Sequence, residues 1–453
     1  MSEANFDTRE QGLRKQLTAG QIAMVAVGGS IGTGLLLGSG EAVHMAGPAV
    51  IFSYVLSALV AWTVAMAMGE LSSMHPAAGS FGLYAETYLN DWAGFVARYG
   101  YWFSVVIAIG SELVAAGIYM QVWFPKTPIV LWMVMFGALL LLINLFPVGS
   151  YGTVEYWFAF IKVITIFLFI LVGAWLLFGR RVQPQYLISG TFAPNGWTAA
   201  LRASSFGLYS FLGIEMVAIS SGEARSSAAI ARATRVAFAV LGVVYVGAIA
   251  VLVGVMPWNQ AGVTQSPFVT VFQVARIPAA GFIMNIVVLS AALSGANATL
   301  YVASRMLFSL ARSGHAPRHL GRLDQNGVPM RALLTSMLGI VAAILVQFRT
   351  PNAYLYIINA ALIGGMLAWL VSLAAHVQFR RTTSREQVSS LPLRSPFGAV
   401  GSIAGFVAII AAIVSTAWGG QVRVAAYSSL GYLAILSAAY FLVKAAELKR
   451  EGS

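Results

Sequence analysis

Four glycines interrupt an apolar segment that is otherwise long enough to cross a membrane. Residues 28–34 read Gly-Gly-Ser-Ile-Gly-Thr-Gly, within an apolar stretch that covers residues 22–40. A glycine in a helix interior is less favourable than an alanine by about 1 kcal/mol. A bilayer also offers no water to satisfy freed backbone groups, so unwound backbone is tolerated only where it is buried in protein or lines a cavity. We therefore expect residues 30–34 to form a hinge whose bare backbone binds a ligand.

Composition places the chain in a membrane. Of its 453 residues, 59% are hydrophobic and 9% are charged, whereas about 25% of the residues in an average soluble domain are charged. The first 16 residues are polar and a long apolar segment follows them, so we expect no cleaved signal peptide. Cysteine is absent, which excludes disulfides and thiolate chemistry. The net charge of +12 indicates basic cytoplasmic loops rather than nucleic-acid binding, because no basic run with interleaved aromatics lies outside the apolar segments.

The apolar pattern predicts an all-α integral membrane protein with twelve spans. They are expected near residues 21–41, 47–69, 94–123, 128–147, 154–178, 201–222, 236–256, 279–310, 332–348, 352–378, 399–418 and 424–446. If both termini are cytoplasmic, nineteen of the 27 Lys and Arg residues lie inside, seven lie outside, and Lys162 lies within a span. This bias favours cytoplasmic termini.

A second group of small and polar residues lies five spans after the first. Residues 205–215 read Ser-Phe-Gly-Leu-Tyr-Ser-Phe-Leu-Gly-Ile-Glu, in the middle of a hydrophobic segment. Interrupted helices at corresponding positions of two halves indicate an inverted-repeat transporter. An odd number of spans in each repeat would place the second half upside down relative to the first.

The first break is suited to a zwitterion. A helix that restarts inside the membrane exposes free N–H groups at the positive end of its dipole, and this arrangement binds a carboxylate. Gly32, Thr33 and Gly34 are placed for this, with the Thr33 hydroxyl as a further donor. The carbonyl of Ser30, before the break, suits an ammonium. The alternative is small-residue packing of two helices, which requires fewer glycines. The same residues match G-x-S-x-G formally, but no strand or His partner supports a nucleophile elbow.

Three ionisable residues at membrane depth are further site candidates, since such residues are unfavourable in a bilayer and commonly functional. Lys162 lies too deep for its side chain to reach the surface, so we expect it to exchange a proton; the alternative is a permanently charged Lys bonded to backbone carbonyls. Glu215 adjoins the second break, and Glu112 lies in the third span. Either could meet a ligand ammonium or a proton, or be held neutral in a hydrogen bond between helices. Its position favours the site for Glu215, and both alternatives stay open for Glu112.

Tyr209 and Phe211 stand beside the second break. An aromatic ring there could close over a bound molecule, although aromatic residues in a span more often serve packing. Residues 294–297 (Ser-Gly-Ala-Asn) form another small polar cluster that either approaches Lys162 or lets helices pack. His315 and His319 have i,i+4 spacing, but Pro317 lies between them, so we expect no metal site.

Several motifs in order resemble the bacterial amino acid permeases of the amino acid–polyamine–organocation superfamily. The motifs are residues 28–34, Glu70-Leu71 with Pro76 and residues 79–81, residues 155–158 with 161–163, residues 213–215 with 222–223, residues 304–307, Ala316-Pro317, residues 327–329 and residues 368–370. After Glu223 the chain departs from the family, because Ala-Arg-Ser-Ser-Ala-Ala replaces an acid and a proline-containing linker.

The resemblance implies a LeuT-like fold, in which ten helices form a five-plus-five inverted repeat with helices 1 and 6 unwound. The implied organisation is a cytoplasmic tail at 1–20, repeats at 21–178 and 201–378, an extracytoplasmic loop at 179–200, a cytoplasmic loop at 379–398, two added helices at 399–446 and a cytoplasmic tail at 447–453.

The resemblance also implies the residues of the site. Thr33 and Gly34 match positions that hold the substrate carboxylate, and the carbonyls of Ser30, Tyr209 and Leu212 match those that hold the α-amino group. Tyr209 matches an aromatic gate, and Glu215 matches the acid of helix 6. Lys162 matches a lysine that replaces a sodium ion of sodium-coupled relatives.

We therefore expect a proton-coupled amino acid symporter of the inner or plasma membrane, and not an enzyme. Lys162 is the expected coupling group, with Glu215 as the second. The expected partners are an amino acid, protons and membrane lipid, without nucleic acid, cofactor or metal. The alternatives are an amino acid exchanger in which Lys162 stays charged, an intramembrane hydrolase that uses Ser30, and a solute sensor.

Overall fold

The computed structural model describes residues 17–76, 80–145, 151–179, 183–184, 191–312, 314–324, 328–418 and 423–451. Their regular secondary structure is helical, apart from one isolated bridge between Leu17 and Ala224. Nine stretches within these residues are helical, apolar and long enough to cross a membrane. The first, Ala19–Met74, has 56 residues, more than twice the about 20 residues that span a bilayer. Two shorter apolar helices, Ile129–Asn144 and Ser429–Ala445, accompany them. The all-helical, multi-pass character is confirmed, and the twelve-span count and the inverted repeat stay predictions.

The first apolar segment is divided where its glycines lie. Helix α2 (Ala19–Ser30) begins at a capping box, in which the Thr18 hydroxyl accepts the Gln21 N–H and the Gln21 side chain accepts the Thr18 N–H. Residues 31–32 leave the helix. The chain then resumes as the π-helix η1 (Gly34–Gly38). Helix α3 (Ser39–Ala46) follows it and ends five residues beyond the predicted span end at 41. The following elements are η2 (Gly47–Ala49), α4 (Val50–Met74), α5 (Ser80–Tyr88), α6 (Asp91–Gln121), α7 (Ile129–Asn144) and α8 (Tyr151–Phe178).

The second small-residue cluster also ends a helix. Helix α10 (Trp197–Phe211) stops at the cluster, and the backbone turns at Gly213, whose φ of +110° is one that glycine adopts readily. The elements after it are α11 (Met216–Ile219), η3 (Ser220–Glu223) and α12 (Ser227–Val255).

Several predicted boundaries differ from the structure, among them the start of α12, which lies nine residues before the predicted span start at 236. Helix α10 begins inside the predicted loop 179–200, of which residues 180–182 and 185–190 lie outside the described part of the chain. The predicted loop 379–398 contains the end of α17 and the short α18, and the predicted span 332–348 is divided into α15 and α16. The remaining elements are η4 (Trp258–Gln260), α13 (Pro267–Val274), α14 (Pro278–Arg312), η5 (Arg318–Gly321), α15 (Met330–Ser336), α16 (Leu338–Arg349), α17 (Ala353–Thr382), α18 (Arg385–Ser390), α19 (Gly398–Ser415), η6 (Thr416–Trp418) and α20 (Arg423–Glu451).

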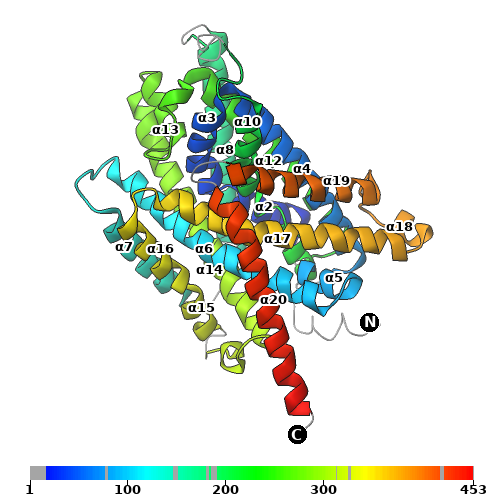
Figure 1. Cartoon of the computed structure of the whole chain (residues 1–453). Helices are drawn as coiled ribbons and strands as arrows, with labels where there is room; N and C mark the ends of the chain where they lie inside the picture. The colour runs from blue at the N-terminus through cyan, green and yellow to red at the C-terminus, as the bar shows by residue number, and fades with distance from the viewer. Residues whose placement is uncertain are drawn as a thin grey trace.

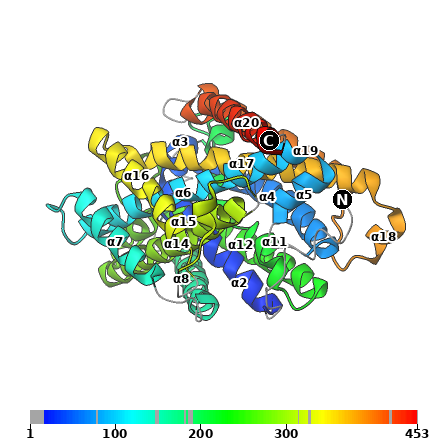
Figure 2. The same ribbon diagram turned by 90° about the horizontal axis from the view of Figure 1, so that it is seen from below.

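Two groups of helices pack around the breaks. Helix α2 packs against α8 and α12, and α4 packs against α10 and α12; in the other group, α6 packs against α7, α14, α16 and α17 (Figures 1 and 2). One hydrophobic core runs through both groups and includes Ile31 from the first break and Phe211 and Ile214 from the second. The two breaks therefore lie in the buried interior, where their backbone groups depend on protein partners.

Candidate functional site

The two helix breaks contact each other. A Cβ on Gly213 would lie 2.7 Å from the backbone nitrogen of Ser30, and a Cβ on Gly34 would lie 2.8 Å from the ring of Tyr209 and 3.1 Å from the Cα of Ser210. Only glycine permits these approaches without displacement of backbone or ring atoms. The segments predicted to act together thus form one centre.

Two oppositely charged side chains hold the ends of the first break. The Lys162 Nζ donates a hydrogen bond of 3.0 Å to the carbonyl of Gly28, in the last turn of α2. The Glu112 Oε1 accepts a hydrogen bond of 3.1 Å from the backbone N–H of Thr33, directly before η1. Both residues are buried, with exposures of 2% and 7%. A cation at a helix C-terminus and an anion at a helix N-terminus both interact favourably with the helix dipoles.

Further backbone groups of the first break have partners inside the protein, among them the Ser30 carbonyl and the Gly32 N–H, which were predicted to bind a zwitterion. The Ser30 carbonyl accepts the Gly32 N–H at 2.9 Å and the Tyr245 hydroxyl at 2.6 Å. The Thr33 carbonyl accepts the Tyr354 hydroxyl at 2.7 Å. In this conformation a ligand would therefore have to replace existing hydrogen bonds.

Glu215 closes the second break. Its carboxylate oxygens accept the Gly213 N–H at 2.9 and 3.0 Å, and Oε2 also accepts the indole N–H of Trp369 at 3.1 Å. The side chain is 1% exposed. These bonds join the break to α17, so Glu215 positions the unwound backbone between α10 and α11. The carbonyl of Tyr209, also predicted for the ammonium, accepts the N–H of Leu212 at 3.1 Å.

A cavity of about 50 Å³ lies between the breaks. Its lining comes from both breaks and from α6 and α14: Gly29, Ser30, Gly32, Gly34, Tyr101, Ser104, Val105, Ala108, Glu112, Tyr209, Leu212, Gly213, Glu215, Met216 and Thr299. This volume is close to that of one or two waters and well below the about 300–1,000 Å³ of small-molecule sites. Admission of an amino acid therefore requires side chains to move, and Tyr209, whose hydroxyl lies 3.0 Å from that of Ser111, is one that fills the space.

Three predicted site residues are not among those that line this cavity. Phe211 packs against Tyr245, with 4.7 Å between ring centroids. Thr33 contributes its backbone N–H, which Glu112 accepts, and Lys162 contacts the Gly28 carbonyl beside the first break without lining the cavity. In the small polar cluster at residues 294–297, Asn297 accepts a hydrogen bond of 2.7 Å from Asn144 on α7. This bond joins two helices, which is a packing role.

Nothing in the sequence marks Tyr245 or Tyr354 as partners of the breaks, and Trp369 enters only through the family motif at residues 368–370, which assigns it no role at the site. Aromatic residues make up 12% of the chain, and their type alone does not separate these three from packing residues. Ser111 and Thr299 were also missed, although Ser111 precedes Glu112 and shares its helix. Their roles follow from the packing of α6, α12, α14 and α17 on the breaks.

A multi-pass helical bundle in which two interrupted helices meet at a buried polar centre defines a class of membrane transporters. The chain belongs to the amino acid permease family: the profile described as "Amino acid permease" matches residues 21–446. Its relatives are permeases and transport proteins, not enzymes.

Individual relatives agree with this assignment. The γ-aminobutyric acid permease of Bacillus subtilis is 34% identical over 422 residues, which cover 91% of this chain and 90% of the relative. The aromatic amino acid transport protein AroP of Escherichia coli K12 is 35% identical over 383 residues, which cover 83% and 84%. The crystal structure of a manganese transporter from Eremococcus coleocola aligns with a TM-score of 0.55 over 98% of this chain and 96% of that chain, at 14% identity. This last likeness concerns the fold alone.

Proposed function

We propose that this protein imports an amino acid across the plasma membrane by proton symport, with both termini in the cytoplasm and a five-plus-five inverted repeat. Membership of the permease family supports transport of an amino acid. The observation that carries the proposal is the contact between Gly213 and Ser30, which joins the two helix breaks into one centre. This centre offers backbone N–H groups to an anion and backbone carbonyls to a cation. Alternating access then moves one group of helices against the other around this centre.

The substrate would bridge the two breaks. Its carboxylate takes the amides of residues 32–34, where a restarted helix favours an anion. Its ammonium takes the carbonyls of Ser30, Tyr209 and Leu212, with the side chains of Glu112 and Glu215 close to it. Because Glu112 already accepts the Thr33 N–H, binding of the carboxylate requires Glu112 to withdraw.

Lys162 is the proposed coupling group. Lys162 lies on α8, and its bond to the Gly28 carbonyl on α2 connects the two helices. The charged ammonium group takes the place of a bound cation. Loss of its proton toward the cytoplasm would weaken this connection and allow the first break to move. Glu215 is the second proposed proton carrier, although its two oxygens are engaged by Gly213 and Trp369.

A second mode is exchange of one amino acid for another, in which Lys162 keeps its proton. The observation in its favour is the hydrogen bond from Lys162 to a backbone carbonyl, which stabilises the charged form. The two modes differ in whether a proton gradient alone drives net uptake.

Uptake into proteoliposomes tests the proposal. The substrate is first selected by thermal shift from the common α-amino acids and γ-aminobutyrate, which the relatives' names suggest. Purified protein is then given an imposed proton gradient without sodium. Accumulation against the substrate gradient supports symport, counterflow without net accumulation supports exchange, and no flux of any bound amino acid contradicts transport. Gly34→Val should weaken substrate binding, and unchanged affinity would move the carboxylate site elsewhere.

A further inference from the structure

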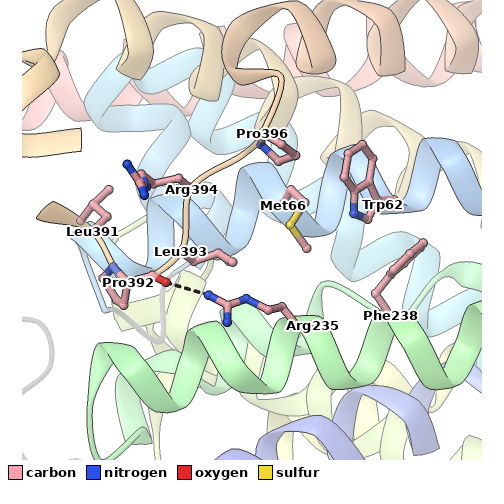
Figure 3. A pocket seen from close by; sticks show the side chains of 9 residues that line it. All are labelled: Trp62, Met66, Arg235, Phe238, Leu391, Pro392, Leu393, Arg394 and Pro396. Carbon is pink, nitrogen blue, oxygen red and sulfur yellow. Dashed lines mark hydrogen bonds between the residues drawn. The ribbon is translucent and has the colours of Figure 1, made fainter. Parts of the chain in front are cut away.

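We propose that an anionic phospholipid of the cytoplasmic leaflet binds, through its headgroup, in a cavity between α4, α12 and the loop before α19. The cavity has a volume of about 500 Å³, and the side chains that line it are drawn in Figure 3. None of its lining residues lines the cavity between the two breaks. Its lining consists of Trp62, Met66, Arg235, Phe238, Leu391, Pro392, Leu393, Arg394 and Pro396. The assignment to the cytoplasmic leaflet rests on the proposed orientation of the chain.

The charge of the cavity suits a phosphate group. Two of its nine lining residues, Arg235 and Arg394, are cationic, and none is a carboxylate. Figure 3 shows the Arg235 side chain reaching from α12 toward the loop, where its Nη2 donates a hydrogen bond of 2.9 Å to the Pro392 carbonyl. A guanidinium carries five N–H donors, more than this single bond requires. The bond therefore orients Arg235 while leaving donors to meet phosphate oxygens.

The apolar part of the cavity favours a lipid over a soluble anion. Trp62 and Phe238 lie on the side of the cavity away from Leu391 and Pro392 (Figure 3), and Met66 packs with Leu393 of the loop. Phe397, which is 64% exposed, follows the loop and packs edge-on against Trp62, with 5.6 Å between ring centroids. Val400, on α19, is 72% exposed. This apolar surface continues outward from the cavity, so an acyl chain can pack on it beside the cationic groups. Basic pockets between membrane helices commonly hold anionic lipid headgroups.

The loop that closes the cavity is held in place independently of a ligand. Glu70 on α4 accepts the Ser395 N–H at 2.7 Å, and Arg380 on α17 donates to the Ser395 carbonyl at 3.1 Å. Glu70 is fully buried and also bonds to Arg380 at 2.7 Å, so its charge is balanced within the protein. A lipid in the cavity would therefore contact a preformed surface shared by α4, α12 and the loop.

The test uses the purified full-length protein with two lipids of identical acyl chains, dioleoyl phosphatidylglycerol and dioleoyl phosphatidylcholine. Lipid retention is measured by native mass spectrometry, and stabilisation is measured as the shift in Tm. We expect preferential retention of phosphatidylglycerol. Arg235→Gln and Arg394→Gln should each weaken that retention by about fivefold, as expected for loss of one cationic contact. Arg394→Gln is included because, unlike Arg235→Gln, it leaves the bond from Arg235 to the Pro392 carbonyl of the loop intact.

Arg331→Gln, an exposed arginine at the start of α15, is the matched control and should leave retention unchanged. Equal retention of the two lipids by the wild-type protein would overturn the proposal. So would an equal effect of Arg331→Gln and Arg394→Gln. Inorganic phosphate and glycerol 3-phosphate form a third arm: if either stabilises the protein as strongly as phosphatidylglycerol, the site binds a soluble anion and the lipid assignment is wrong. These measurements need no substrate, so they are independent of the transport assay.

Discussion

The carboxylate of Glu112 accepts a hydrogen bond of 3.1 Å from the backbone N–H of Thr33. It occupies a position that suits the carboxylate of an amino acid, at the start of a restarted helix. Gly295 on α14 makes room for it, because a Cβ there would lie 3.3 Å from the Glu112 carboxyl group. In the proposed binding mode, a side chain of the protein and the carboxylate of the substrate would therefore compete for one amide. Protonation of Glu112 would weaken its hold on that amide and link substrate binding to proton uptake.

This competition predicts the pH dependence of substrate affinity. If binding takes up a proton on Glu112, affinity rises as pH falls, by at most about tenfold per pH unit for one proton. Glu112→Gln keeps the size of the side chain and removes the titration of this group, so the affinity of the variant should vary less with pH than that of the wild type. Isothermal titration calorimetry between pH 5.5 and 8 measures the substrate affinity of the wild type and of Glu112→Gln. Glu386→Gln, on the exposed helix α18, is the control and should behave as the wild type. A Glu112→Gln variant with the full wild-type pH dependence would contradict the link.

Lys162→Met should reduce uptake driven by a proton gradient by at least about tenfold. The change removes the hydrogen bond to the Gly28 carbonyl and leaves that buried acceptor unsatisfied next to the first break. Initial rates in proteoliposomes provide the measurement. Lys444→Met, on α20, controls for loss of a lysine away from the breaks and should transport normally. The coupling role is wrong if Lys162→Met imports at the wild-type rate.

Gly213→Ala should destabilise the protein by about 2–4 kcal/mol, because alanine is strained at a φ of +110° and its Cβ would lie 2.7 Å from the Ser30 nitrogen. Gly242→Ala on α12 is the matched control, since a Cβ there meets nothing within 4 Å. It should be neutral or stabilising by up to about 1 kcal/mol. Thermal unfolding in detergent compares the two. Equal Tm values for the two variants would argue against a tight contact between the breaks.

Arg380→Gln should destabilise the protein by about 3–5 kcal/mol, because the buried Glu70 carboxylate loses the guanidinium at 2.7 Å and keeps the His376 imidazole at 3.2 Å. The same measurement on Arg381→Gln, the exposed neighbour on α17, should show little change. The Glu70→Gln/Arg380→Gln double variant should recover part of the loss, since it removes the uncompensated charge. A double variant less stable than Arg380→Gln alone would show that the ion pair is not the cause.

Properties that depend on local chemistry could be predicted from the sequence. The apolar runs predicted an all-helical membrane protein, since a bilayer accepts only backbone whose hydrogen bonds are satisfied within the protein. The glycines of residues 28–34 predicted where α2 ends, and the cluster around Gly213 predicted the end of α10. The depth of Lys162 in its span predicted that it is buried, and its exposure is 2%. Its bond to the Gly28 carbonyl corresponds to the alternative reading of a Lys held by backbone carbonyls, and the sequence left the surroundings of Glu112 open.

The tertiary structure decided which groups meet. It placed Glu112 and Lys162 at opposite ends of one break, directed Phe211 toward Tyr245, and joined Glu215 to Trp369. These contacts join residues far apart in the chain, and they depend on how helices rotate and approach one another. Hydropathy and glycine spacing determine where a helix lies and where it breaks. The partner of each buried polar atom is determined only when neighbouring helices pack, because packing alone sets the direction and distance of the side chains.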